Sequence, residues 1–193
     1  MNKLEGFYFF KEVLIPTVEW QEYKGQKLNE NFLWTVRTAV FSGDDFNLPR
    51  LVGVTASEAQ AFADSLKQNL NGEGIVIVYP FFIAKVSGTL VVDSEKITLE
   101  CVLGDLWNLV TYGKPNYSAI FKGENVQTYG ECPINNAEIS QLLVCAEKLK
   151  RAFREQLAEG KSVYAEWSFA FKTDKTKQSI GEKFTVFYEL KTV

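Results

Sequence analysis

The sequence predicts an α+β fold with a mainly antiparallel sheet and two main helices. Short runs rich in Val, Ile and Phe, separated by polar or glycine-containing segments, fill residues 75–121. Such runs are typical of neighbouring buried strands. Two other stretches, at about 55–71 and 137–159, repeat apolar residues at helical spacing. A chain of 193 residues is long enough to form a single domain over 1–193 with a hydrophobic core.

Composition and charge narrow the classes of function. The chain is 46% hydrophobic and 14% aromatic, which favours globular order over disorder. A net charge of −3 gives no electrostatic basis for nucleic-acid binding. The apolar stretch 7–10 is interrupted by Lys11 and Glu12, so we expect neither a signal peptide nor a membrane span. The odd number of cysteines and the lack of a CxxC pair suggest a reducing compartment, and we expect the cytoplasm.

The chain contains no histidine. This excludes Ser-His-Asp and Cys-His nucleophile systems, histidine general bases and histidine-ligated metals. It also excludes a phosphohistidine formed on this chain. Any catalysis must therefore use carboxylates, lysines, arginines or tyrosines, or a hard cation such as Mg²⁺ held by oxygen ligands.

The first part of the chain is interpreted as an irregular or β segment followed by a strand and a helix. Residues 1–30 mix aromatic with charged side chains and contain a polar loop. We expect a strand at 32–39, closed by a turn at 42–45. The first helix then begins at a capping box formed by Thr55 and Glu58.

Residues 75–121 are expected to form the centre of the sheet. The polar segment 93–96 is the turn of a hairpin. The second helix follows, with one apolar stripe that ends near Gly160. The remaining expected strands are 75–83, 88–92, 97–103, a run that begins near Tyr117, 162–171 and 183–191.

Several short motifs follow one another in a distinctive order: Val36-Arg37-Thr38-Ala39, Ser87-Gly88-Thr89, Leu103-Gly104-Asp105, Val110-Thr111-Tyr112-Gly113, Pro115-Asn116-Tyr117 and Glu166-Trp167. This order resembles the ATP-grasp domain at the N-terminus of phosphoenolpyruvate synthase and pyruvate phosphate dikinase. The resemblance implies an ATP-grasp-like fold. Residues 31–193 match the family, and 1–30 are a short remnant of its first lobe.

The resemblance also implies a site for ATP and Mg²⁺. In the family, an arginine at the position of Arg37 binds ATP phosphates, a role that suits a planar and permanently charged group. A glutamate at the position of Glu166 and a glutamine at that of Glu189 lie beside Mg²⁺ and phosphate. An arginine at the position of Lys191 binds phosphate. All four residues are therefore expected to bind nucleotide, and the two glutamates are expected to bind the metal.

The residues themselves support part of this site and leave alternatives open. Strand alternation puts Ala165, Trp167 and Phe169 on one face and Glu166 on the other. Without a nucleotide, Arg37 would be a strand residue that pairs with a surface carboxylate. Glu166 would then lie on the solvent side of an edge strand.

Departures from the family pattern bear on activity. The family's Gly-Gly-Lys loop, whose lysine reaches ATP phosphates, has no counterpart here, and Lys11 and Lys24 are candidate replacements. Lys191 gives up the bidentate geometry of arginine, and Glu189 adds negative charge where the family has glutamine. Three functions are open: an ATP-dependent, kinase-like phosphotransferase with a separate acceptor protein or subunit, a non-catalytic nucleotide-binding regulator, or an interaction scaffold that has lost ATP binding.

Overall fold

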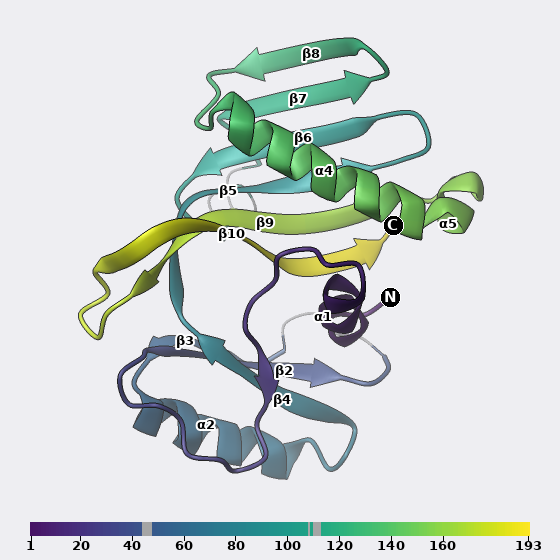
Figure 1. Cartoon of the computed structure of the whole chain (residues 1–193). Helices are drawn as coiled ribbons and strands as arrows, with labels where there is room; N and C mark the ends of the chain where they lie inside the picture. Colours follow the sequence, from purple (N-terminus) through teal and green to yellow (C-terminus); the bar gives the residue numbers. More distant parts are fainter. Residues whose placement is uncertain (44–47, 108, 110–112) are drawn as a thin grey trace.

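The computed structural model describes residues 1–43, 48–107, 109 and 113–193 (Figure 1). Its strands form one four-stranded and one six-stranded sheet, and every strand pair within them is antiparallel. The predicted turn at Asp44-Asp45 and most of the motif at 110–113 lie outside the described residues. Within the described part of the chain, no helix has the length and apolar character needed to span a membrane.

The small lobe consists of the four-stranded sheet and helix α2 (Ala56–Asn69), which packs on one of its faces. The predicted capping box is present, because the Thr55 hydroxyl accepts from the Glu58 amide and the Glu58 carboxylate accepts from the Thr55 amide. Leu66 of this helix packs in one cluster with Val36. The strand order is β1 (Gln21–Glu22), β4 (Gly74–Pro80), β2 (Trp34–Val40) and β3 (Arg50–Val54).

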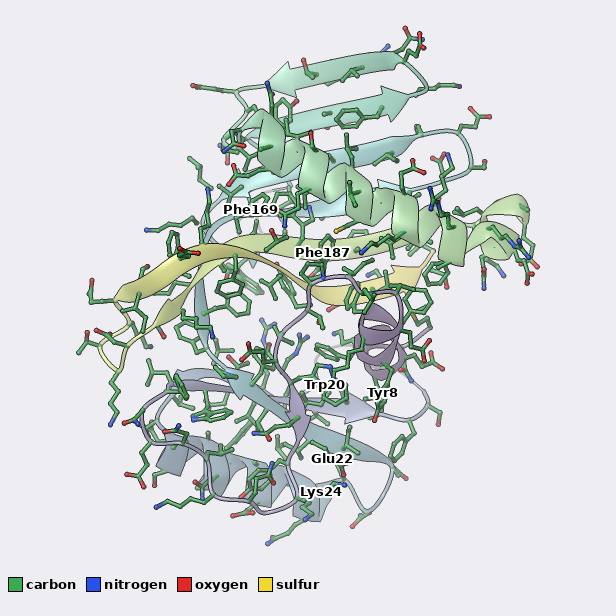
Figure 2. All side chains as sticks on the ribbon, viewed as in Figure 1. Tyr8, Trp20, Glu22, Lys24, Phe169 and Phe187 are labelled. Carbon is green, nitrogen blue, oxygen red and sulfur yellow. The ribbon has the colours of Figure 1, made fainter. Side chains whose placement is uncertain are left out.

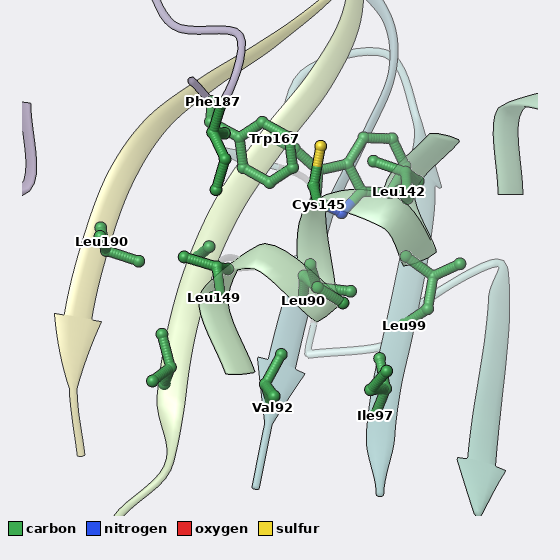
Figure 3. Packing of buried hydrophobic residues seen from close by; sticks show 14 of the residues in the cluster. Leu90, Val92, Ile97, Leu99, Leu142, Cys145, Leu149, Trp167, Phe187 and Leu190 are labelled. Carbon is green, nitrogen blue, oxygen red and sulfur yellow. The ribbon is translucent and has the colours of Figure 1, made fainter. Parts of the chain in front are cut away.

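The large lobe consists of the six-stranded sheet with α4 (Asn136–Ala152) and α5 (Arg154–Ala158) (Figure 1). Leu142 and Leu149 of α4 pack in one buried cluster with Trp167 from the sheet (Figure 3). The strand order is β10 (Ser179–Thr192), β9 (Val163–Thr173), β5 (Phe82–Val92), β6 (Ile97–Leu103), β7 (Tyr117–Lys122) and β8 (Asn125–Gly130).

These elements confirm the α+β class, the antiparallel sheets and the two main helices. The predicted hairpin is β5–β6, in which Val92 pairs with Ile97 around the turn 93–96. The second main helix is broken at Phe153, so the predicted helix 137–159 is two helices, α4 and α5.

The predicted strand 75–83 is wrong as a single strand. Its first part is β4 of the small lobe, and its last residues begin β5 of the large lobe. Pro80 has no amide hydrogen with which to extend the ladder. The next amide, that of Phe81, donates to the Leu33 carbonyl at 2.8 Å. The chain therefore passes from one sheet to the other at this point.

The irregular or β segment predicted for residues 1–30 is wrong over its first part, where helix α1 (Lys3–Glu12) lies, whereas the rest contains the short strand β1. Asn2 and Glu5 form a capping box at its start. Leu4, Phe7 and Phe10 are its buried apolar residues, and their three-residue spacing puts them on one face. The aromatic run 7–10 conceals this period, since the exposed Tyr8 and the half-buried Phe9 lie between the buried Phe7 and Phe10.

The segment 14–20 leads from α1 to β1 and connects the lobes. Thr17 bridges to Phe187 of β10, and its hydroxyl donates to the Phe187 carbonyl at 2.9 Å. Trp20 then packs edge-on against Tyr8, with ring centroids 5.1 Å apart (Figure 2). The Lys11 ammonium lies 3.9 Å from the centroid of the Trp20 ring. The segment therefore holds the edge of the large sheet, α1 and the small lobe together.

Candidate functional site

A cleft of about 880 Å³ lies between the lobes. Arg37 and Tyr79 line it from the small lobe, and Lys3 lines it from α1. The large lobe contributes its β9 and β10 residues Tyr164, Glu166, Ser168, Tyr188, Glu189 and Lys191. The structure thus brings the sequence-predicted residues Arg37, Glu166, Glu189 and Lys191 together, although they come from three strands.

Glu166 and Glu189 are paired neighbours on adjacent strands. The register between β9 and β10 shifts between Phe187 and Glu189, so Tyr188 is the extra residue of a β-bulge. The bulge turns both Tyr188 and Glu189 toward the cleft, while Phe187 and Leu190 remain in the core. The alternative that Glu166 lies on an edge strand is wrong, because β9 lies between β10 and β5.

Glu189 is held by two cations. The Lys3 Nζ and an Arg37 guanidinium nitrogen each lie 3.7 Å from the same Glu189 oxygen, Oε2. All three side chains are largely removed from solvent, with 19%, 13% and 14% exposure for Lys3, Arg37 and Glu189. Arg37 is therefore not paired with a surface carboxylate. Although its burial acts in the opposite direction, the neighbouring Tyr79 and Glu189 raise the pKa of Arg37.

Glu166 lies in a different electrostatic setting. Burial, followed by repulsion from Glu189, raises the pKa of its carboxyl group from 4.5 to about 7. A hydrogen bond from the Tyr164 hydroxyl at 3.0 Å, together with Arg37 and Lys191, opposes this shift. The two neighbouring carboxylates therefore differ, because Glu189 has close cationic partners and Glu166 is held mainly by a phenol.

Lys191 pairs in register with Tyr164 of β9, and its Nζ lies 4.7 Å from the centroid of the Tyr164 ring. This is a cation–π contact. This contact keeps a positive charge on the same wall as the carboxylates. The hydroxyl group of the same tyrosine, Tyr164, donates to Glu166.

A chain of hydroxyl groups begins in the cleft wall at Ser168 and Tyr188 and continues to the buried Ser87. The Ser87 and Ser168 hydroxyls are 2.8 Å apart, and the Ser168 and Tyr188 hydroxyls are 3.3 Å apart. Ser87 also donates to the Gly104 carbonyl at 2.7 Å. Two residues of the sequence motifs are therefore linked here, Ser87 from Ser87-Gly88-Thr89 and Gly104 from Leu103-Gly104-Asp105.

Sequence reasoning missed several cleft residues. Lys3 was missed because its segment was not predicted to be helical, and the candidate replacements Lys11 and Lys24 do not line the cleft. Lys24 instead pairs with Glu22 at the surface, 3.2 Å away (Figure 2). Tyr164 could have been found from strand alternation, since it lies two residues before Glu166 and shares its face.

The donor set fits a polyphosphate with a hard cation. Lys3, Arg37 and Lys191 are donors suited to phosphate oxygens. Mg²⁺ is commonly bound through one or two carboxylates together with substrate phosphates, which matches the pair Glu166 and Glu189. Among the described residues no group of three or more metal-ligating side chains occurs.

Comparisons with known proteins give matches at the level of structure. No protein-family model and no curated protein matches the sequence. D-alanine–D-alanine ligase from Helicobacter pylori matches with a TM-score of 0.52 and 14% identity, over 98% of this chain and 50% of the ligase. The ADP complex of N5-carboxyaminoimidazole ribonucleotide synthetase matches with a TM-score of 0.50 and 11% identity, over 98% of this chain and 44% of the synthetase.

These two structures are ATP-grasp enzymes. At this level of identity the likeness shows the fold alone, and it confirms the ATP-grasp-like fold predicted from the sequence. This chain spans about half the length of the structures that it matches. The specific resemblance to phosphoenolpyruvate synthase rests on the sequence motifs.

Proposed function

We propose that this chain binds Mg-ATP in the cleft between its lobes. The main support is that Arg37, Glu166, Glu189 and Lys191 come from three strands and all line one cleft. Arg37 and Lys191 hold phosphate oxygens through charge-assisted hydrogen bonds, and the two glutamates hold Mg²⁺ together with those oxygens. A cleft of about 880 Å³ is within the size range of ligand pockets.

The proposed reaction is phosphoryl transfer to an acceptor on a separate protein or subunit. The bond from ADP to the terminal phosphorus breaks, ADP leaves with the electron pair, and a bond to the acceptor forms. Positioning and charge neutralisation provide the catalysis in such transfers, and the cations of the cleft are suited to both. The motifs resembling phosphoenolpyruvate synthase support this choice. Since the chain has no histidine, a phosphohistidine acceptor belongs to another protein.

A nucleotide-binding regulator without turnover is the second candidate. It is supported by the ion pairs of Glu189 with Lys3 and Arg37. These pairs already occupy residues that phosphoryl transfer would need for binding Mg²⁺ and phosphate. Release of ADP from Mg-ATP in the presence of a candidate acceptor distinguishes the two functions. The cytoplasm remains the proposed location, supported by the three unpaired cysteines.

The test is calorimetric titration of Mg-ATP into the wild type, Arg37→Ala and Arg151→Ala. Loss of a charge-assisted phosphate contact should weaken binding by about tenfold or more in Arg37→Ala. Arg151 is exposed on α4, so Arg151→Ala is a matched control that should bind as the wild type does. Circular dichroism establishes that each variant is folded. A folded wild type that binds no Mg-ATP would overturn the proposal.

A further inference from the structure

Helix α1 delivers Lys3 into the cleft from a firmly anchored position. The Asn2 side-chain amide donates to the carbonyls of Val40 and Phe41 at the end of β2, both at 3.1 Å. On the other side, Gly6 lies against β10, where an added Cβ would be 3.0 Å from the Leu190 carbonyl oxygen. The helix is therefore attached to both lobes, and Lys3 is its first residue.

The ion pairs around Glu189 leave an excess of positive charge. Lys3 and Arg37 approach the same carboxylate oxygen, so one negative charge faces two positive charges in a place with little solvent. Lys191 lies on the same wall, so the three cations Lys3, Arg37 and Lys191 outnumber the carboxylates Glu166 and Glu189 even when both are ionised. Charges with little access to water favour an additional counter-ion. A polyanion would supply it.

The same contacts obstruct a divalent cation. A cation that binds Glu189 would have to lie next to the ammonium of Lys3 and the guanidinium of Arg37, and it would be repelled by both. Arg37 is held between Tyr79 of the small lobe and Glu189 of the large lobe. Lys3, in contrast, has a flexible four-carbon stem with three rotatable donors and can change partners within the cleft.

We propose that Lys3 is a built-in counter-cation of this site: it occupies Glu189 in the ligand-free cleft and moves to the phosphates of a bound nucleotide, which leaves Glu189 open to Mg²⁺. The inference rests on the proposed function, because it describes how that site is regulated. It makes cation binding conditional on nucleotide. By linkage, the nucleotide and the cation then strengthen each other's binding by the same factor.

The test measures the two ligands separately in wild type, Lys3→Gln, Lys3→Arg and Lys11→Gln. ADP is titrated in the presence of a chelator by calorimetry, and Mn²⁺, a paramagnetic substitute for Mg²⁺, is titrated without nucleotide by electron paramagnetic resonance. Lys11 belongs to the same helix but packs on Trp20 and does not line the cleft. Lys11→Gln is therefore the matched control for the same substitution.

We expect Lys3→Gln to change the two affinities in opposite directions. ADP binding should weaken about tenfold, since one charge-assisted contact is lost. Mn²⁺ binding should strengthen about fivefold or more, since a positive charge beside Glu189 is gone. Lys3→Arg and Lys11→Gln should stay close to the wild type. This opposite response distinguishes the inference from a structural role, in which loss of α1 anchoring would weaken both ligands.

Other outcomes separate the inference from the proposed function. If the wild type binds ADP and Lys3→Gln binds both ligands unchanged, the role of Lys3 is overturned and the nucleotide site stands. The same holds if both affinities fall together. If the folded wild type binds no ADP, with or without Mn²⁺, the proposed function is overturned and the inference with it.

Discussion

Successive residues of strand β9 point to opposite faces of the sheet, and the two faces have different roles. Ala165, Trp167 and Phe169 belong to the buried cluster beneath α4 and are at most 2% exposed. Glu166 and Ser168 face the cleft, where their partners are the hydroxyls of tyrosine and serine residues. One strand therefore provides the core of the large lobe on one side and a wall of the candidate site on the other.

The difference lies in the free energy that each face contributes. Burial of the apolar side chains stabilises the fold in proportion to the area removed from water. On the cleft face, burial of Glu166 beside Glu189 opposes ionisation and raises the pKa of Glu166 to about 7, so ionisation of this carboxyl group destabilises the fold. Stability explains the apolar face. The carboxylate pair is not explained by stability, and it is consistent with the proposed binding site.

The largest expected effect is on the apolar face. Trp167 is fully buried and pairs with Gly88 of β5, where an added Cβ would lie 2.6 Å from the indole ring. Trp167→Ala would leave a cavity under α4, and we expect the free energy of unfolding to fall by about 3–5 kcal/mol. Denaturant unfolding followed by far-UV circular dichroism measures this loss.

Trp167→Phe is the control for shape. The indole nitrogen of Trp167 is buried without a hydrogen-bond partner among the described residues, so replacing it with phenylalanine removes no hydrogen bond. We expect a loss well below that of the alanine variant. A loss under about 1 kcal/mol for Trp167→Ala would contradict the burial that the comparison of the two faces assumes.

The apolar face could be predicted from the sequence, and the geometry of the site could not. Alternation along β9 places Trp167 and Glu166 on opposite faces, and the structure agrees. The same rule applied to β10 would put Phe187 and Glu189 on one face. Only the bulge at Tyr188 brings Glu189 into the cleft, and no local signal in this segment indicates a bulge.

Contacts between residues that are far apart in the sequence could not be predicted either. Lys3 and Glu189 lie near opposite ends of the sequence and meet because α1 packs against β10. Their contact depends on tertiary packing, which cannot be predicted from the spacing of apolar residues in the sequence. Arg37 and Glu166, in contrast, could be assigned to one site in advance because the order of motifs resembles a known family. The identity of these residues was therefore predictable, and their pairing with Glu189 was not.

The second expected effect is a pH dependence caused by Glu166. The folded protein keeps the carboxyl proton up to about pH 7, whereas the ordinary value for the unfolded chain is 4.5. Between these values the native state binds more protons, so the free energy of unfolding falls as pH rises. The contribution is about 3 kcal/mol at most and is complete above pH 7.

Glu166→Gln isolates this contribution. The variant cannot ionise at this position, so its stability relative to the wild type should increase from pH 5 to about pH 7 and then level off towards pH 8. Denaturant unfolding at unit steps of pH measures the difference in the free energy of unfolding between the variant and the wild type. The contributions of other titrating groups are the same in both proteins and cancel in this difference. The exposed Glu147→Gln on α4 should give a flat difference. If the difference for Glu166→Gln were also independent of pH, the cleft would not raise the pKa of this carboxyl group.

The smallest expected effect is that of Ser168→Ala, next to Trp167 on the cleft face. The substitution removes one hydroxyl from the chain of Ser87, Ser168 and Tyr188, but Ser87 keeps its bond to the Gly104 carbonyl. We expect a loss of about 1 kcal/mol in the free energy of unfolding. Ser140→Ala, at an exposed position of α4, should cause no loss, because alanine favours the helix. If Ser168→Ala were as damaging as Trp167→Ala, both faces of β9 would act as core, and the division of this strand into a structural and a functional side would be wrong.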